Sequence, residues 1–324
     1  MGTSSIRVRQ RGGALLAVLW LTACLSAIAF SVAATVRTET ERTSAQADRL
    51  RTYYLASGAV DRAILYMIWG PGPRNPDGSA RYWEQGLPRM DMAFPSGVAR
   101  VELIPEYAKL NVNSLPPQEL FRLLVNLGVE PPRAEEITAA ILDWRTASPG
   151  PSSFDAHYSS QSPSFRARHA SLEELEELLF VKGMTPEIYH GSWTRDPQGR
   201  LVPRGALKDC LSIYGSMTAV DVNYAEPAVL LTVGLSPDQV AAVVDRRRAL
   251  PFRNMQQVQQ FLQGGPGVGR LQVGGGTIYS VRGTGRLRLP NGGLSDTTRS
   301  VTAVVKFREY GHTPPVEILR WYEN

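Results

Sequence analysis

The sequence predicts an α+β protein with one long amino-terminal helix, a small antiparallel sheet, and a large helical segment inserted between strands of that sheet. Three observations support this fold class. An uncharged apolar run near the amino terminus continues into a segment with helical spacing. Alternating β patterns stand far apart, at residues 98–105 and after residue 277, and the mostly helical stretch between them repeats itself. A chain of 324 residues is long enough for about two domains.

Residues 13–36 contain no charged side chain. A helix rises about 1.5 Å per residue, so this run is long enough to cross a hydrocarbon core of about 30 Å. Arg7, Arg9 and Arg11 precede the run without an acid, whereas charges of both signs follow it. The positive-inside bias therefore predicts a single-pass protein with a cytoplasmic amino terminus and everything after about residue 40 exported. A secretory signal peptide is not expected, because residues 33–35 match its cleavage site poorly.

The residues directly before the apolar run, 9–12, read RQRG and are followed by GALL. This junction resembles the site cut by prepilin peptidase between Gly12 and Gly13, after which the apolar helix stays on the mature protein. An uncleaved signal anchor is the alternative, and the leader alone does not separate the two. Loss of the leader would remove three arginines and lower the net charge from +5 to +2. The overall basicity is thus weak evidence for nucleic-acid binding.

The helix is predicted to continue beyond the membrane to about Trp69. Apolar and small residues recur alternately three and four positions apart, with charged residues between them, at Leu50, Tyr53, Ser57, Val60, Ile64 and Met67. The sequence GPGP at residues 70–73 then ends the helix, since proline lacks an amide donor.

The strands of the small sheet are expected at residues 98–105, 277–289, 300–308 and 316–322. The sequence PNGG at residues 290–293 is turn material between two of them. The intervening helical region is therefore predicted to be an insertion into the sheet.

This insertion contains a degenerate repeat, which begins with LNVN at residues 110–113 and again with VDVN at residues 220–223. Each half has the pattern helix, glycine turn, helix, and each is completed by a second hairpin-like stretch. The pattern resembles two pairs of the helix-hairpin-helix module, which in many proteins binds DNA phosphates through backbone N–H groups.

Only the glycine turn at residues 265–269 has the small residues that a phosphate contact needs, and Arg246, Arg247, Arg248, Arg253 and Arg270 could supply charge nearby. We favour a solvated helix face beside a structural turn, because the other three turns lack such glycines. Nucleic acid is therefore not an expected partner, and a membrane-tethered DNA-binding protein of the competence type is kept as the alternative function.

A search for catalytic motifs finds none, and no enzyme activity is predicted. The histidines lack ligand spacing and are expected to be surface or loop residues: His157, His169, His190 and His312. The triplet Asp143-Trp144-Arg145 is interpreted as a helix-end salt bridge or cap rather than a calcium site. Cys24 and Cys210 are expected to be small buried residues, and no role is assigned to Cys210.

Several segments together resemble the K-type minor pseudopilin of bacterial type II secretion systems, over nearly the whole chain. They are RQRG/GALLAVLWL, YYLASGAVDRAILYM, LNVNS, VDVNY, AILDWR and LLFVKGMTPEIYHG. The resemblance implies a pilin fold with a prepilin leader at residues 1–12, a transmembrane and spine helix at 13–69, pilin-type α/β parts at 70–108 and 276–324, and an inserted helical domain at 109–275.

The resemblance also implies where the protein acts. It implies an inner-membrane helix with the bulk of the chain in the periplasm, a processed and methylated amino terminus, and a place at the tip of the pseudopilus that exports folded proteins. The implied partners are I-type and J-type minor pseudopilins, and through them the H-type and major pseudopilins, together with prepilin peptidase. Direct contact with a secreted substrate is left open. No cofactor is expected, although calcium is left open without assigned site residues.

Cleavage after Gly12 would make Ala17 the fifth mature residue, and neither Ala17 nor its neighbour Val18 is acidic. Most pilin-type subunits resemble each other in carrying a glutamate there, which can neutralise a neighbour's terminal ammonium inside the lipid. A subunit at the tip has no neighbour above it, so the missing acid agrees with the K-type. The predicted membrane and assembly residues of the helix are Ala17, Trp20, Leu50, Tyr53, Val60 and Ile64.

Overall fold

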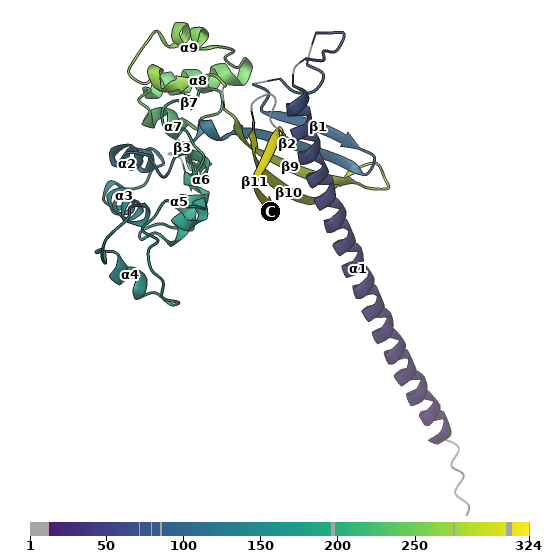
Figure 1. The fold of residues 1–324 in the computed structure, drawn as a ribbon. Coiled ribbons are helices and arrows are strands. Elements are labelled where there is room, and N and C mark those ends of the chain that lie inside the picture. Colours follow the sequence, from purple (N-terminus) through teal and green to yellow (C-terminus); the bar gives the residue numbers. More distant parts are fainter. Residues whose placement is uncertain are drawn as a thin grey trace, which may run out of the picture.

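A computed structural model describes residues 13–70, 72–78, 80–84, 86–195, 198–274, 276–308 and 313–323. The leader at residues 1–12, and with it Gly12 of the predicted cleavage site, lies outside the described residues. The molecule has three parts, a long helix, a five-stranded sheet and a group of short helices (Figure 1). The sheet lies between the end of the long helix and the group of short helices.

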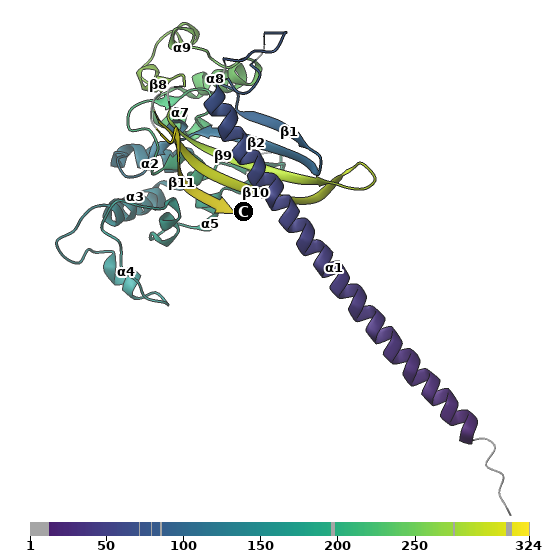
Figure 2. The same cartoon turned by 45° about the vertical axis from the view of Figure 1, so that its right-hand side comes forward.

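Helix α1 spans Gly13–Trp69 without interruption, which confirms the predicted long amino-terminal helix. It ends where Gly70 adopts a φ of +61° and donates its amide to the carbonyl of Tyr66 at 3.0 Å. Glycine takes this left-handed conformation without the steric cost of a Cβ atom. The amino-terminal part of α1 projects away from the rest of the molecule, and the carboxy-terminal part lies across the sheet (Figure 2).

The sheet is antiparallel throughout and has the strand order β1-β2-β9-β10-β11. Its strands are β1 (Arg89–Phe94), β2 (Gly97–Pro105), β9 (Ile278–Arg288), β10 (Leu294–Phe307) and β11 (Val316–Glu323). Strands β2 and β9 are neighbours, so the whole chain between them is inserted into one sheet, as the sequence predicts. The prediction omitted β1, whose sequence RMDMAF has a single buried position.

Helix α1 contacts the sheet through small residues. Ala56, Ala59 and Ala63 are fully buried against it. On strand β9, a Cβ atom at Gly283 would lie 2.6 Å from the carbonyl oxygen of Ala56, and one at Gly285 would lie 2.8 Å from the carbonyl oxygen of Thr52. The backbones of helix and strand therefore approach more closely than any larger residue would allow.

The inserted region consists of short elements arranged around a second hydrophobic core. Its first half contains η1 (Glu106–Ala108), β3 (Leu110–Asn111), α2 (Pro117–Asn126), α3 (Pro131–Arg145), α4 (Asp155–Ser159), η2 (Leu175–Phe180), α5 (Pro186–His190), β4 (Ser192–Arg195), β5 (Leu201–Arg204), α6 (Leu207–Cys210) and β6 (Leu211–Ser212). Its second half contains β7 (Val220–Asp221), α7 (Pro227–Thr232), α8 (Pro237–Ala249), α9 (Met255–Leu262), η3 (Val268–Arg270) and β8 (Leu271–Gln272).

The two halves repeat each other in their hydrogen bonds. In the first, β3 pairs in parallel with β6, and Arg145 at the end of α3 donates to the carbonyls of Val112 and Leu115. In the second, β7 pairs in parallel with β8, and Arg247 near the end of α8 donates to the carbonyls of Val222 and Ala225, at 3.0 and 2.7 Å. Each guanidinium thus holds the loop that leads into the first helix of its half.

The asparagines two positions after the short strands are equivalent as well. Asn113 exchanges two hydrogen bonds with the backbone of Leu172, and Asn223 exchanges two with the backbone of Phe252, all between 2.8 and 3.0 Å. The correspondence that the sequence indicated is therefore present in the contacts. The assignment of these halves to the helix-hairpin-helix module stays a prediction, as do the domain boundaries.

Replacement of Arg145 or Arg247 tests whether each guanidinium stabilises the loop that it holds. We expect Arg145→Met and Arg247→Met each to lower the free energy of unfolding by about 3 kcal/mol, because two carbonyls lose a charged donor in a partly buried site. Arg122→Met on the exposed side of α2 is the control, with an expected change within about 0.5 kcal/mol. Urea denaturation of the full chain in detergent measures all three. Equal stability of the three variants would contradict the assignment.

The close contact between α1 and β9 yields a second prediction. Gly283→Val is expected to lower the free energy of unfolding by about 3 kcal/mol, because its side chain would overlap the backbone of Ala56. Gly58→Ala in the same part of α1 is the matched control, since a Cβ atom there meets nothing within 4 Å. It is expected to stabilise the helix by up to about 1 kcal/mol. The same denaturation measurement decides, and an unchanged midpoint in Gly283→Val would show that the contact is looser than described.

Candidate membrane and assembly helix

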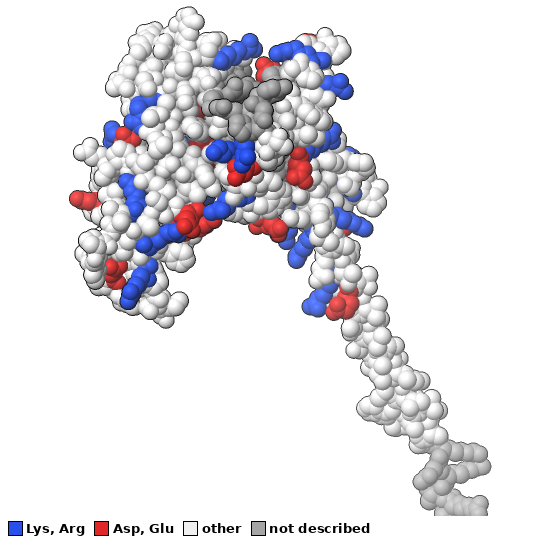
Figure 3. Space-filling view, viewed as in Figure 1, with Lys and Arg blue, Asp and Glu red and all other residues white. Residues whose placement is uncertain are grey.

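The amino-terminal part of α1 is an exposed apolar rod. Large side chains between residues 15 and 36 are 56–77% exposed, including Trp20 at 65%. By length and composition this segment can cross a membrane. In Figure 3 the corresponding stretch of helix is almost free of charge, whereas positive and negative side chains are interspersed over the visible face of the globular part.

A charged stretch separates the apolar rod from the part of α1 that lies on the sheet. Three ion pairs within the helix join Arg37 to Glu41, Arg42 to Glu39, and Arg51 to Asp48, at 2.9–3.4 Å. All six side chains are at least 47% exposed, so these pairs contribute little to stability. From residue 37 onward the surface of the helix is therefore charged and can be solvated by water.

The predicted helix residues fall into two environments. Ala17, Trp20 and Leu50 are exposed, Leu50 at 55%. Val60 and Ile64 are buried against the sheet, at 0% and 8% exposure, so they offer no surface to a partner.

Tyr53 lies between these environments. It is half-buried, and its hydroxyl donates to a carboxylate oxygen of Glu323 at 2.9 Å. This bond ties α1 to the carboxy-terminal strand.

The buried face of α1 coincides only in part with the residues whose spacing predicted the helix. The buried positions are Thr52, Leu55, Ala56, Ala59, Val60, Ala63, Ile64 and Met67. Val60, Ile64 and Met67 of the predicted pattern belong to this face, whereas Leu50 is exposed and Tyr53 and Ser57 are half-buried. Alanines form the tightest part of the contact. The two glycines of β9 were the missing signal, since a Gly-Thr-Gly run in a strand indicates a close backbone approach.

The triplet at the end of α3 was predicted to form a helix-end salt bridge or cap, and its two charged side chains are engaged separately. Arg145 donates to backbone carbonyls, and the carboxylate of Asp143 accepts from the hydroxyl of Ser152 at 3.0 Å. His169 packs against this site with a φ of +48°, and its ring lies 3.1 Å from a carboxylate oxygen of Asp155. Burial lowers the pKa of His169, but hydrogen bonds to Asp155 and to the carbonyl of Asp143 outweigh it and raise that pKa overall.

His169 is thus a half-buried loop residue, and His312 lies outside the described residues. Within the described part of the chain, no group of three or more His, Cys, Asp or Glu side chains is placed to hold a metal ion. Cys210 is buried as expected, whereas Cys24 is exposed on the apolar rod.

The arginines considered for DNA binding are largely engaged within the protein. Arg247 holds its own loop, and Arg246 stacks over Phe252 and donates to the carbonyl of Leu250. Arg270 forms two hydrogen bonds with the carboxylate of Glu119, at 3.0 and 3.2 Å. The basic cluster that the sequence suggested is therefore mostly structural.

The glycine-rich turn is also packed inside the insertion. A Cβ atom at Gly267 would lie 2.6 Å from the backbone of Gly234, in the turn between α7 and α8. This contact explains Gly267 without a phosphate, and Gly265 has a φ of +124°, which favours glycine, so DNA binding is not favoured.

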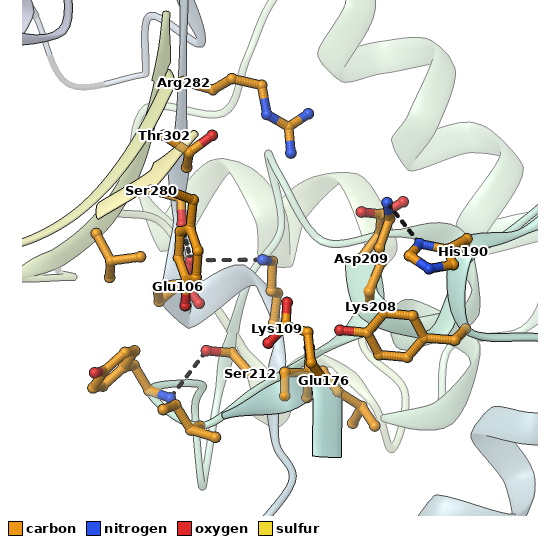
Figure 4. Close-up of a pocket in the computed structure, with 17 residues that line it drawn as sticks. Glu106, Lys109, Glu176, His190, Lys208, Asp209, Ser212, Ser280, Arg282 and Thr302 are labelled. Atoms are coloured by element: carbon orange, nitrogen blue, oxygen red, sulfur yellow. Dashed lines mark hydrogen bonds and ion pairs between the residues drawn. The ribbon is translucent and has the colours of Figure 1, made fainter. Parts of the chain in front are cut away.

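A polar pocket of about 250 Å³ lies between strands β9, β10 and β11 of the sheet and the first half of the insertion (Figure 4). Ser280 donates to the buried carboxylate of Glu106 at 2.5 Å, and the ammonium of Lys109 lies 3.6 Å from the same carboxylate. The charged residues lining the pocket are Glu106, Lys109, Glu176, Lys208, Asp209 and Arg282. Acids and bases are balanced, so the lining does not select a ligand of either sign.

Comparison with known proteins shows what this chain is similar to. A family model described as type II secretion system (T2SS), protein K, matches residues 107–191. Type II secretion system protein K of Pectobacterium carotovorum subsp. carotovorum is 27% identical over 279 residues, which cover 79% of this chain and 80% of the relative. The protein of the same name from Klebsiella pneumoniae is 29% identical over 264 residues, 76% of each chain.

The fold has a solved counterpart. A chain in the crystal structure of the GspK-GspI-GspJ complex from the type 2 secretion system of enterotoxigenic Escherichia coli matches with a TM-score of 0.58 and 15% identity, over 87% of this chain and 99% of that chain. An exposed apolar helix that continues across an antiparallel sheet is typical of subunits of the pilin class. Within that class, the sequence matches confirm the resemblance: the chain is a relative of type II secretion system protein K, the K-type minor pseudopilin.

Proposed function

We propose that this protein is the minor pseudopilin at the tip of a type II secretion pseudopilus, where it initiates or caps assembly for the export of folded proteins across the outer membrane. The observation that carries the proposal is the division of α1. Its amino-terminal part is an uncharged, exposed rod, and its carboxy-terminal part is fixed to the chain's own sheet. Such a helix can pack beside the helices of other subunits without disturbing its own fold.

The residues near the start of the rod support the tip position. Ala17 occupies the fifth position after the proposed cut, and residues 13–36 contain no acid. An acidic side chain in lipid is expensive unless a neighbouring charge compensates it. A subunit with no neighbour above it has no such compensation, so an uncharged residue is the stable choice.

The position of the insertion supports a capping role. It lies across the sheet from α1, which leaves the apolar rod open to partners (Figure 2). The first half of the insertion is fixed to strand β11, where Arg320 lies 2.8 Å from the carboxylate of Glu174 and the hydroxyl of Tyr322 donates to that carboxylate at 3.2 Å. A bulky body beside the end of the helix would hinder the addition of a further subunit above it.

The proposed partners follow from the family. The solved structural relative was crystallised in a complex of GspK, GspI and GspJ. We therefore propose I-type and J-type minor pseudopilins as direct partners, H-type and major pseudopilins below them, and prepilin peptidase as the processing enzyme. The proposed location is the inner membrane, with the amino terminus cytoplasmic and the bulk of the chain periplasmic. We assign no catalytic activity, cofactor or calcium site.

Processing provides the first functional test. Gly12→Val is expected to block cleavage and to abolish export of the secreted proteins, because the residue before the cut must be small. Mass spectrometry of the amino terminus measures cleavage, its register and N-methylation together. Gln10→Ala is the control and is expected to be processed normally. Normal processing and secretion in Gly12→Val would contradict the proposal.

Partner contact provides the second test. Leu50 and Tyr54 are 55% and 64% exposed on α1 beyond the apolar rod. We expect Leu50→Ser combined with Tyr54→Ser to reduce co-purification with the I-type and J-type pseudopilins by about fivefold or more, because exposed apolar anchors dominate interfaces. The thermal midpoint of the isolated chain should not change. Arg49→Ser, on the same exposed stretch, is the control, and an equal yield of complex from both variants would exclude this face from the interface.

A further inference from the structure

A second pocket, with a volume of about 500 Å³, lies between Arg74, residues 83–84 and 86–87, strand β9 and the second half of the insertion. Its lining is rich in aromatic rings. Trp83 meets Tyr279 edge to face with their centroids 6.1 Å apart, and Tyr224 and Phe252 add two further rings from the insertion. The negative faces of aromatic rings attract cations, most strongly where water is excluded.

The same pocket contains a buried carboxylate. Asp221 is 2% exposed, and its two oxygens accept from the amides of Asn223 and Gly274, at 2.9 and 3.0 Å. These bonds satisfy only part of its acceptor capacity. Burial raises the pKa of Asp221 to about 6, although the two amides and Arg247 oppose the shift.

The equivalent position of the internal repeat carries a neutral side chain. Asn111 is equivalent to Asp221, and its side-chain oxygen accepts from the amide of Asn113 at 2.9 Å, in the same turn. The amide nitrogen of Asn111 also donates to the carbonyl of Ile213 at 3.0 Å, so in the first half a neutral side chain both accepts and donates. Burial of the Asp221 carboxylate lowers the stability of the fold. Besides the amide of Asn223, the amide of Gly274 is the only backbone donor to this carboxylate among the described residues.

The other charged groups around the pocket leave room for a cation. Arg247 is committed to the carbonyls of Val222 and Ala225. Arg74 lies 3.9 Å from Glu84 on the opposite wall, and Arg253 is exposed at the rim. Burial raises the pKa values of Tyr224 and Tyr279, and the nearby charge of Asp221 raises both further.

We propose that this pocket binds a guanidinium group, supplied as an arginine side chain by a protein segment that docks against the second half of the insertion. A guanidinium is planar, so it stacks on aromatic rings while its several N–H donors reach a carboxylate and phenol oxygens together. A lysine ammonium offers no flat face and is more strongly hydrated. The site is independent of the apolar rod, so a segment bound there would be held by the inserted body.

The test uses the full chain in detergent and three small probes, N-acetylarginine amide, N-acetyllysine amide and N-acetylcitrulline amide. Citrulline has nearly the shape of arginine without its charge. We expect calorimetry to show saturable binding of the arginine probe, with affinity about tenfold or more above that of either other probe. Equal affinity for the citrulline probe, or no binding of the arginine probe at 1:1 stoichiometry, would overturn the proposal.

Variants locate the site. Asp221→Asn, which places in the second half the residue found in the first, is expected to lower affinity for the arginine probe about tenfold. Trp83→Leu removes one wall without touching the repeat and should also weaken binding, which keeps the test decisive if Asp221→Asn does not fold. Arg253→Ala removes a like charge from the rim and should strengthen binding. Unchanged affinity in both Asp221→Asn and Trp83→Leu, with native thermal midpoints, would exclude this pocket.

The pH dependence separates a charged contact from a structural one. The folded-state pKa of Asp221 lies above its unfolded value, so protonation becomes favourable as the pH falls through about 6. Affinity for the arginine probe should therefore decrease from pH 7 to pH 5 in the wild-type chain and stay flat in Asp221→Asn. The stability of the free protein should change in the opposite sense, because the buried charge is lost at low pH. Parallel pH profiles for the two proteins would refute the role of Asp221.

Discussion

The contact between helix α1 and strand β9 is the constraint on which the rest of the structure depends. The carbonyl of Ala56 lies so close to Gly283 that a methyl group would not fit between them. Because alanines on the helix meet glycines on the strand, backbone approaches backbone, and a long helix is held by the middle strand of a small sheet. Larger residues would increase the buried area at this contact, but they would also push the helix away from the strands on either side.

Because of this contact, one helix can combine an apolar segment suited to lipid with a segment that packs on a water-exposed folded domain. The carboxy-terminal part of α1 is anchored to the sheet, so the amino-terminal part can remain an apolar rod without destabilising the folded region. The change occurs over the charged stretch between Arg37 and Arg51, where ion pairs within the helix satisfy opposite charges along an exposed surface. A pseudopilus subunit of the proposed kind needs both properties, since it must pack with other helices while its own body stays folded.

The insertion achieves its stability by a different means. Two halves each use a parallel pair of very short strands, an asparagine that fixes a distant loop, and an arginine that holds the loop before its first helix. Charged donors on backbone carbonyls support segments too short to be stable as isolated helices. The halves differ at Asn111 and Asp221, and that difference between otherwise equivalent positions directs attention to the aromatic pocket.

The sequence by itself determined the long helix, its apolar part, strands β2, β9, β10 and β11, and the repeat, because these depend on periodicity and on residue types close together in the chain. It also gave the family resemblance, which rests on the order of several motifs. Tertiary structure alone decided which face of α1 is buried, because that face is set by Gly283 and Gly285 more than 200 residues away. Tertiary structure also decided the hydrogen-bond partners of Arg145 and Arg247, because these partners are backbone carbonyls and carry no sequence signal. It likewise brought Trp83, Tyr279 and Asp221 together in one pocket.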